Sequence, residues 1–298
     1  RQCSLQKCPA RGVGRLAHGV WSRSRQRWQH PAMNWLRRTR QAFWGMVFAA
    51  LWRRTRESGE TPPPAFSLLI RGGTVYDGSG GLPRVADIGI VRDRIAAIGD
   101  LGWMNGRVEI DARGLAVAPG FINSLSWATE SIIEDATAES DMRQGVTLEV
   151  FGEGLSMGPL NASMRGDLRL RRLGSRYPLD WNTLGEYLEF LEKRGVGVNV
   201  ASLVGATTVR IHELGHADRS PNARELTRMQ GLVRQAMLEG ALGVGSSLIY
   251  APAAFAAPAE LQALALAAAE YGGGYFSHVR SESTQLLTAI DELIDIAR

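Results

Sequence analysis

Between residues 66 and 117, hydrophobic and polar residues alternate in short runs that are separated by tight-turn residues. The stretch "LLIRGGTVYDGSG" is interrupted by Gly72-Gly73 and by Asp77-Gly78, and "ADIGIVRDRIAAIGDL" turns at Arg92-Asp93. Short alternating runs bounded by such turns are typical of β-strands joined by hairpins. Residues 65–118 are therefore predicted to form a small antiparallel β subdomain.

After Pro119 the pattern changes to apolar strands that alternate with helical stretches. The expected strands are 115–122, 146–151, 198–204, 241–248 and 274–278, and the clearest helices are 222–239 and 258–271. Alternating apolar strands and helices indicate an α/β fold with a parallel sheet. No G-x-G-x-x-G follows an early strand, which weakens the case for a dinucleotide-binding fold. Residues 119–298 are predicted to form part of a (β/α)8 TIM barrel, about five of its eight units.

Charge is distributed unevenly along the chain. Residues 1–58 hold 13 Lys and Arg but one acid, Glu57, whereas the remainder holds 21 bases and 29 acids. The basic extension 1–64 is predicted to be disordered or leader-like. The acidic body gives no reason to expect binding to nucleic acid.

The extension contains one apolar segment, residues 42–52, which follows Met33 and three arginines. Eleven residues are too few to cross a bilayer, which needs about 20. The arrangement is similar to the short apolar core of a signal peptide, but no cleavage-site pattern follows it. We expect a cytoplasmic location. Export, or weak contact with a membrane surface through the leader, is the alternative if this segment is a signal.

The stretch "IHELGH" at 211–216 contains H-E-x-x-H, a motif of zinc metalloproteases. In those enzymes the motif lies on one helix, where its two histidines bind zinc and its glutamate acts as the general base. Here the preceding residues are β-branched and Gly-rich, and Gly215 lies inside the motif. We expect a strand followed by a loop that exposes His212 and His216. A zinc protease is the less favoured alternative.

Several motifs occur together in the body: "LLIRGGTVYDGSG", "IDARGLAVAPGFI", "RQGVTLEVFGEG", "EGALGVGSSLIYAP" and "YGGGYFSHVRSES". Together they resemble the N-acyl-D-amino-acid deacylase (D-aminoacylase) family of the amidohydrolase superfamily, over residues 66–298. The resemblance implies a metal-bearing (β/α)8 barrel beside a small β-sandwich. It also implies hydrolysis of the amide bond of a small N-acyl amino acid by a zinc-activated water. Acyl group, stereochemistry and oligomeric state stay open.

The motif of the first barrel strand departs from that pattern. The superfamily usually reads G-F-I-D-x-H-x-H, whose histidines hold one metal, whereas this chain reads "GFINSLSW". Leu125 and Trp127 therefore stand at ligand positions but cannot coordinate zinc, and Asn123 replaces the acid.

Two other positions retain ligand types. Glu153 is the nearest substitute for the zinc-binding Cys of D-aminoacylases, and His278 falls where the family places a zinc-binding His. Carboxylate and imidazole both bind zinc. The resemblance thus implies one zinc ion held by Glu153 and His278, with the next ligand histidine and the general base expected beyond Arg298.

Three further residues are candidates for the site. Tyr250 would line the substrate pocket or cover apolar surface, and Arg280 would bind a substrate carboxylate or pair with Glu282. Glu149 lies within an apolar strand, where a lone charge is costly. We favour a structural ion pair for Glu149 over a role facing the metal.

Two other functions remain as alternatives to the deacylase. One is a catalytically inactive homologue that has lost its metal, and the other is a hydrolase of cyclic amides of the same superfamily. The chain stops after the fifth expected strand, so on its own it is predicted to be inactive and prone to aggregation through open strand edges.

Overall fold

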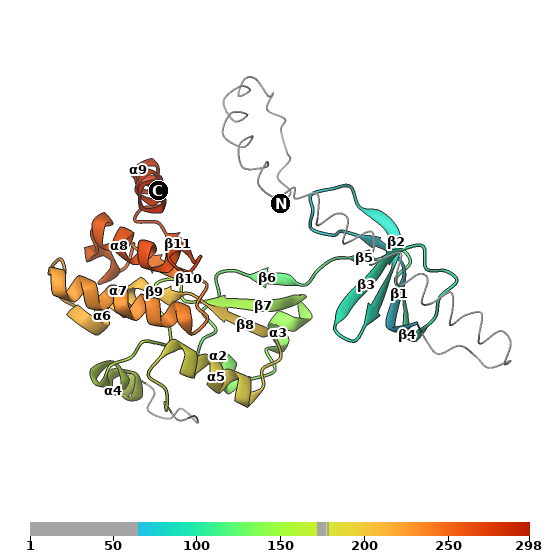
Figure 1. Cartoon of the computed structure of the whole chain (residues 1–298), viewed down its shortest axis with the longest axis horizontal. Coiled ribbons are helices and arrows are strands. Elements are labelled where there is room, and N and C mark those ends of the chain that lie inside the picture. Colours follow the sequence, from blue (N-terminus) through green and yellow to red (C-terminus); the bar gives the residue numbers. More distant parts are fainter. Residues whose placement is uncertain (1–64, 172–176, 178) are drawn as a thin grey trace, which may run out of the picture. The chain divides into compact units, whose positions relative to one another are not determined.

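The computed structural model describes residues 65–171, 177 and 179–298 of the chain. The predictions for the extension 1–64, including the segment after Met33, lie outside these residues. The chain divides after Pro119 into two compact units, which are described separately (Figure 1). Within the described ranges, no helix has both the length and the apolar composition needed to cross a membrane.

The first unit contains a single five-stranded sheet. Its strands are β1 (Phe66–Val75), β2 (Arg84–Val91), β3 (Arg94–Gly99), β4 (Gly106–Asp111) and β5 (Ala116–Val117). The order is β3-β2-β1-β4, with β5 also paired to β1. The pairs β1–β2 and β2–β3 are antiparallel, as predicted, but β4 and β5 run parallel to β1, so the all-antiparallel prediction is wrong for them.

The connection between β3 and β4 explains this parallel pairing. It carries Leu101, which is buried against Phe66 and Leu69. Arg71 also holds the connection, because its guanidinium donates hydrogen bonds to Leu101 O (3.0 Å) and Met104 O (2.7 Å). These contacts are tertiary, so the alternation of residues within each strand carries no sign of them.

The second unit is α/β, as predicted. Its strands are β6 (Phe121–Asn123), β7 (Val146–Phe151), β8 (Asn199–Ser202), β9 (Val204–Gly205), β10 (Gly243–Ser247) and β11 (Gly274–His278). All pairs are parallel, in two sheets ordered β6-β7-β8 and β9-β10-β11. Only Leu203 separates β8 from β9 along the chain.

The strand predictions match the structure closely in the second unit, with one clear exception. Strands β7 and β11 have the predicted bounds, β10 lies within its predicted range, and β8–β9 overlaps the predicted strand 198–204 but ends one residue later, at Gly205. The predicted strand 115–122 is wrong, because it breaks into β5 and β6. Pro119, at the break, lacks the backbone N–H that a continuous strand would use for pairing.

Helices connect these strands. They are α2 (Ser131–Glu134), α3 (Glu139–Arg143), α4 (Ala162–Arg171), α5 (Leu184–Arg194), α6 (Ala206–Leu214), α7 (Ala223–Leu238), the 3-10 helix η2 (Ala253–Phe255), α8 (Pro258–Ala269) and α9 (Leu286–Ala297). Helix α7 packs against α6 and α8, and α8 packs on β10 and β11. The apolar core of the unit lies between these helices and the strands.

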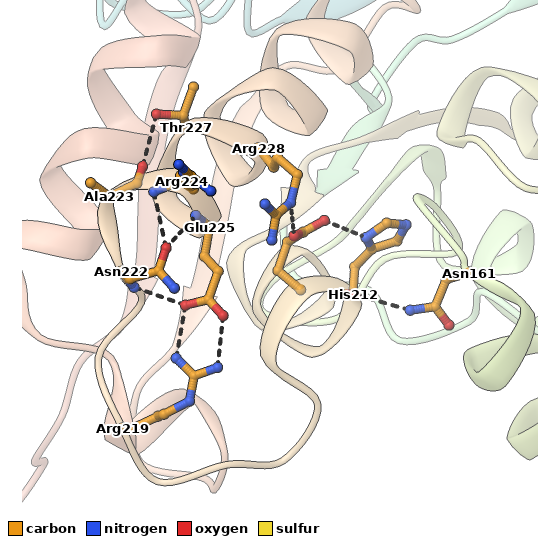
Figure 2. Close-up of polar contacts among 10 residues, drawn as sticks. Asn161, His212, Arg219, Asn222, Ala223, Arg224, Glu225, Thr227 and Arg228 are labelled. Atoms are coloured by element: carbon orange, nitrogen blue, oxygen red, sulfur yellow. Dashed lines mark hydrogen bonds and ion pairs between the residues drawn. The ribbon is translucent and has the colours of Figure 1, made fainter.

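The two helices predicted most clearly, α7 and α8, begin where their capping residues indicate. Asn222 caps α7 by accepting hydrogen bonds from the backbone N–H groups of Arg224 and Glu225, both at 3.0 Å (Figure 2). The Glu225 carboxylate in turn accepts from Asn222 N (2.8 Å), which completes a capping box. Pro258 occupies the first turn of α8, where a missing N–H costs nothing.

Candidate active site

Glu153 and His278 meet at the carboxyl ends of two parallel strands. Glu153 follows β7, and His278 is the last residue of β11. His278 Nδ1 lies 3.5 Å from Glu153 Oε1, and their side chains are 20% and 14% exposed. Working sites of parallel α/β proteins lie at this end of the strands. The structure therefore brings together the two residues to which the sequence assigned one metal ion.

Two glycines build the turn that carries Glu153. Gly152 and Gly154 both have φ of 95°, a conformation that side chains other than glycine's rarely adopt. A Cβ on Gly152 would lie 2.1 Å from Leu203 O, and one on Gly154 would lie 2.7 Å from the Ser247 Cβ. The turn thus passes directly against the neighbouring strand ends, which places Glu153 close to β10.

The surroundings of this pair alter its acid–base properties. Burial raises the pKa of the Glu153 carboxyl; the His278 ring opposes that shift, and the Glu282 carboxylate adds to it. Glu282 Oε1 lies 3.3 Å from His278 Nε2. That nitrogen is buried and makes no hydrogen bond within the described part of the chain. The imidazole therefore lies between two carboxylates that approach different ring nitrogens.

Glu153 and His278 fit a zinc site in part. Ligand atoms in a tetrahedral zinc site, with bonds of about 2.0–2.1 Å, lie roughly 3.4 Å apart. The 3.5 Å between Oε1 and Nδ1 is close to that separation. Among residues 65–171, 177 and 179–298, however, no three His, Cys, Asp or Glu side chains are arranged to hold a metal ion. The pair supplies two ligands, and a complete site needs others.

A cavity of about 690 Å³ adjoins the pair. Its walls come from the segments that follow β6, β7 and β10 and from helices α4 and α6. Gly154, next to Glu153 in the chain, lines it, and so does Ser247, which pairs in register with His278. Its volume lies within the range of small-molecule sites, about 300–1,000 Å³.

Tyr250 and Ser247 place hydroxyl groups at this cavity. Tyr250 lines it, as the sequence suggested, and its ring meets the His278 ring edge to face, with centroids 5.6 Å apart. Sequence reasoning missed Ser247, which is 4% exposed and whose Oγ has no hydrogen-bond partner in the described residues. Its place at the carboxyl end of an expected strand was the available signal.

Arg280 is engaged elsewhere. Its Nη2 lies 2.7 Å from Glu292 Oε1 on α9, and its other N–H groups donate to Glu292 and to the carbonyl oxygens of Ala254 and Ala256. Arg280 was predicted to bind a substrate carboxylate or Glu282, but its partner is Glu292. The packing of α9 beside the segment 254–256 decides this partner. The guanidinium has no pair of free N–H groups left to bind a substrate carboxylate.

The residues of the altered first-strand motif differ in exposure and in contacts. Leu125 and Trp127 are about half exposed, and Trp127 lines the cavity. Asn123 Nδ2 donates to Glu149 Oε2 at 3.1 Å. Glu149 is 1% exposed, its Oε1 has no partner, and no cation pairs with it in the described residues, so the predicted ion pair is wrong. Register places the neutral Asn123 amide directly opposite Glu149 across β6 and β7.

The first three residues of the "HELGH" stretch, His212, Glu213 and Leu214, are helical, which corrects the predicted strand and loop. His212 and Glu213 belong to α6, which ends at Leu214, and Gly215 follows with φ of 62°. The β-branched residues Thr208 and Val209 are buried in this helix. Their packing against the core outweighs their preference for strands.

The stretch does not form the geometry of a zinc protease. His216 lies beyond the end of α6, so it does not share a helix face with His212. Glu213 is held by Arg228, whose Nε donates to Oε2 at 2.6 Å, and by His212 Nδ1 at 3.1 Å from Oε1 (Figure 2). An engaged carboxylate is poorly placed to act as a catalytic base.

Comparison with known proteins connects this geometry to a family. No family model matches the chain. A D-aminoacylase of Alcaligenes xylosoxydans xylosoxydans is 35% identical over 235 residues, which cover 78% of this chain and 48% of that protein. Homologues at 32–36% identity over most of this chain are D-aminoacylase and the N-acyl-D-glutamate and N-acyl-D-aspartate deacylases. The family expected from the sequence motifs is thereby confirmed.

Solved structures support the same relationship. An N-acyl-D-glutamate deacylase from Bordetella bronchiseptica, complexed with zinc and a phosphonate inhibitor, is 34% identical with a TM-score of 0.69. A D-aminoacylase with a binuclear metal centre is 32% identical with a TM-score of 0.68. Each match covers 78% of this chain and 49% of the relative. The chain thus spans about half the length of the relatives that it matches.

Proposed function

We propose that this protein hydrolyses the amide bond of small N-acyl amino acids, with Glu153 and His278 as two ligands of one zinc ion. The observation that carries the proposal is the meeting of these side chains, 3.5 Å apart, beside a cavity of about 690 Å³. The similarity of the chain to deacylases supports the reaction class. In this proposal β6, β7, β8 with β9, β10 and β11 are five consecutive strands of a (β/α)8 barrel.

Zinc held here would supply Lewis acidity, which polarises an amide carbonyl and makes a bound water more acidic. The chain's own residues would position the substrate. Burial of Glu153 and His278 limits competing water at the ligand atoms. Tyr250 and Ser247 place hydroxyl groups at the cavity wall beside them, where they would hydrogen-bond the polar part of the substrate.

The altered first-strand motif favours one zinc ion over two. Leu125 and Trp127 occupy the positions of the superfamily's two ligand histidines, and neither side chain can coordinate a metal. The D-aminoacylase relative is described with a binuclear centre. Loss of one ligand pair in this chain supports a mononuclear site.

Metal analysis joined to an activity assay tests the proposal. Purified with zinc, in a form that includes the segment beyond Arg298 where the general base is expected, the protein should bind one ion per chain and release free amino acid from N-acyl amino acids. His278→Ala and Glu153→Ala should each lose most of the zinc and the hydrolysis. His212→Ala is the matched control, because His212 is bonded to Glu213 and is expected to leave both unchanged.

Other outcomes would contradict the proposal. If wild type binds no zinc and hydrolyses nothing, the protein is a catalytically inactive homologue, which the loss of the H-x-H ligands would explain. If His212→Ala loses the zinc while His278→Ala retains it, the metal lies at the "HELGH" stretch and the proposed site is wrong.

A further inference from the structure

The loop after β11 brings a second carboxylate, that of Glu282, to the proposed zinc ligand His278. We propose that Glu282 is a positioning residue, which accepts a hydrogen bond from His278 Nε2–H and thereby keeps the Nδ1 lone pair directed at the zinc ion and Glu153. This role rests on the proposed function, because Glu282 acts only through zinc bound at His278.

The two nitrogens of the His278 ring face different carboxylates. Nδ1 lies 3.5 Å from Glu153 Oε1, and Nε2 lies 3.3 Å from Glu282 Oε1. Nε2 is buried and has no hydrogen-bond partner in the described part of the chain, so its contact with Glu282 has the distance but not the alignment of a hydrogen bond. Glu282 is 64% exposed, which leaves its carboxylate room to rotate into alignment.

The charge of Glu282 selects the position of the ring proton. An ionised carboxylate accepts hydrogen bonds and donates none, so a bare Nε2 lone pair beside it would meet a second acceptor. An Nε2–H would instead meet its partner, and the neutral ring would then keep its lone pair on Nδ1. Zinc binds imidazole through such a lone pair, and its histidine ligands usually donate their other N–H to a carboxylate, a carbonyl or water.

Glu282 is placed to hold the ring and not the metal. It approaches Nε2, whereas Glu153, the second proposed ligand, approaches Nδ1. Within the residues that the structure describes, no three His, Cys, Asp or Glu side chains are grouped to hold a metal ion, and Glu153, His278 and Glu282 are no exception. Glu282 thus meets the ring nitrogen that a zinc ion on Nδ1 leaves free.

The loop that carries Glu282 is anchored at both ends of the step from His278. His278 ends β11, which fixes the start of the loop. Arg280 donates to carbonyl oxygens of the segment 254–256 at 2.8 and 2.9 Å and pairs with Glu292 on α9. Because Arg280 lies between His278 and Glu282 in the chain, this anchor keeps the carboxylate near the imidazole.

Other contacts restrain the ring without distinguishing its nitrogens. The Tyr250 ring meets the His278 ring edge to face, with centroids 5.6 Å apart and planes at 84°. The His278 carbonyl oxygen accepts a hydrogen bond from Leu248 N at 2.9 Å. These contacts limit the tilt of the imidazole and the movement of its backbone. The choice between Nδ1 and Nε2 is therefore left to the two carboxylates.

Zinc affinity, measured by competition with a chelator, tests this role in the form of the protein that includes the segment beyond Arg298. Glu282→Leu should weaken zinc binding about 10–100-fold, as does the loss of other hydrogen-bond partners of metal-bound histidines. Glu282→Gln keeps an oxygen that accepts from Nε2–H and should recover most of that loss. Glu192→Leu makes the same change at an exposed position of α5 and should leave the affinity unchanged.

Nitrogen-15 NMR of the zinc-loaded protein gives a readout that a merely structural role of Glu282 would not move. In wild type and in Glu282→Gln, His278 should show a metal-bound Nδ1 and a protonated Nε2 with an observable N–H signal. In Glu282→Leu, saturated with zinc, this N–H signal should be lost through faster exchange with water. Equal melting temperatures of the zinc-free wild type and Glu282→Leu would show that the variant is folded.

Four results decide the role of Glu282. A loss of affinity in Glu282→Leu that Glu282→Gln largely restores supports it. Wild-type affinity in Glu282→Leu, with zinc lost in His278→Ala, overturns it and leaves the proposed function standing. Equal losses in Glu282→Leu and Glu282→Gln also overturn it, because the charge of Glu282 alone would then account for the effect. If wild type binds no zinc, both the proposed function and this role are refuted.

Discussion

Arg210 and Glu260 form an almost completely buried ion pair between α6 and α8. Arg210 Nη1 donates to Glu260 Oε2 at 2.6 Å, and the two side chains are 1% and 3% exposed. Arg210 Nη2 also donates to the carbonyl oxygens of Ala217 and Arg219, at 3.1 and 2.7 Å. One guanidinium therefore holds α6 to α8 and fixes the chain that leaves α6.

Removing one partner of this pair should be costly. Arg210→Met leaves the Glu260 charge buried and unpaired, so the free energy of unfolding should fall by about 3–5 kcal/mol. The double variant Arg210→Met/Glu260→Leu should lose less, because no charge is left uncompensated. Arg234→Met breaks the more exposed pair with Glu270 and should cost much less than Arg210→Met, because solvent screens exposed ion pairs. Urea denaturation measures all three, and equal losses in the single and double variants would refute the argument.

Glu153→Gln should act in opposite directions with and without zinc. Burial raises the pKa of the Glu153 carboxyl in the folded protein, so this group opposes folding at pH values above its unfolded pKa, neutral pH included. Without zinc, the variant should therefore have a higher melting temperature than wild type. With zinc it should be stabilised less, because it lacks a ligand.

Thermal unfolding with and without added zinc checks this pair of effects. Glu192→Gln is the control, since Glu192 is an exposed carboxylate on α5 and is expected to change neither value much. A variant that gains as much stability from zinc as wild type would show that Glu153 is not a ligand.

The capping box of α7 should make stability depend on pH. Hydrogen bonds from the Arg219 side chain, and then from the Asn222 backbone, lower the pKa of Glu225 from 4.5 to about 2. A lowered pKa contributes stability above the unfolded value, and this contribution is lost as the pH falls from about 4.5 towards 2. Glu225→Gln should therefore melt below wild type at pH 6.

The difference between Glu225→Gln and wild type should shrink as the pH approaches 2. Glu192→Gln, at an exposed position of α5, removes a carboxylate outside any capping box and serves as the control. Circular dichroism melts from pH 2 to 7 would record the trend, and a constant difference across that range would contradict it.

Glu149 and Asn123 give a prediction about buried polarity. Glu149→Gln keeps an oxygen for the Asn123 amide and removes a buried charge for which the described residues supply no cation, so unfolding should cost roughly 1–3 kcal/mol more. Asn123→Ala should destabilise the protein, because it leaves both Glu149 oxygens unpaired. Asn199→Ala, which removes an exposed hydrogen bond to Thr147 O, should cost less. Destabilisation by Glu149→Gln would show that the charge itself is required.

Some structural features could be predicted from local sequence patterns. The bounds of strands β7 and β11 follow from runs of apolar residues, and the starts of helices α7 and α8 follow from Asn222 and Pro258. Glu153 and His278 were expected to share a zinc ion because the family resemblance places both at ligand positions. That expectation needs no knowledge of side-chain packing.

Other features have no local sign. The β-branched Thr208 and Val209 suggested a strand, yet both are buried in helix α6. Arg280 has Glu282 two residues away but pairs with Glu292, because α9 returns beside it. Ser247 looks ordinary as a sequence letter, and its significance comes from the cavity that it lines.

The sequence by itself determined the bounds of β7 and β11, the starts of α7 and α8, the family resemblance and the two residues proposed to hold zinc. These depend on periodicity and capping over a few neighbouring residues, or on motifs read directly from the chain. Tertiary structure alone decided the parallel pairing of β4, the helical state of residues 212–214, the partners of Arg280 and Glu149, and the walls of the cavity. Those depend on which distant elements pack together, and the free energy of burial that selects such packing belongs to the whole fold.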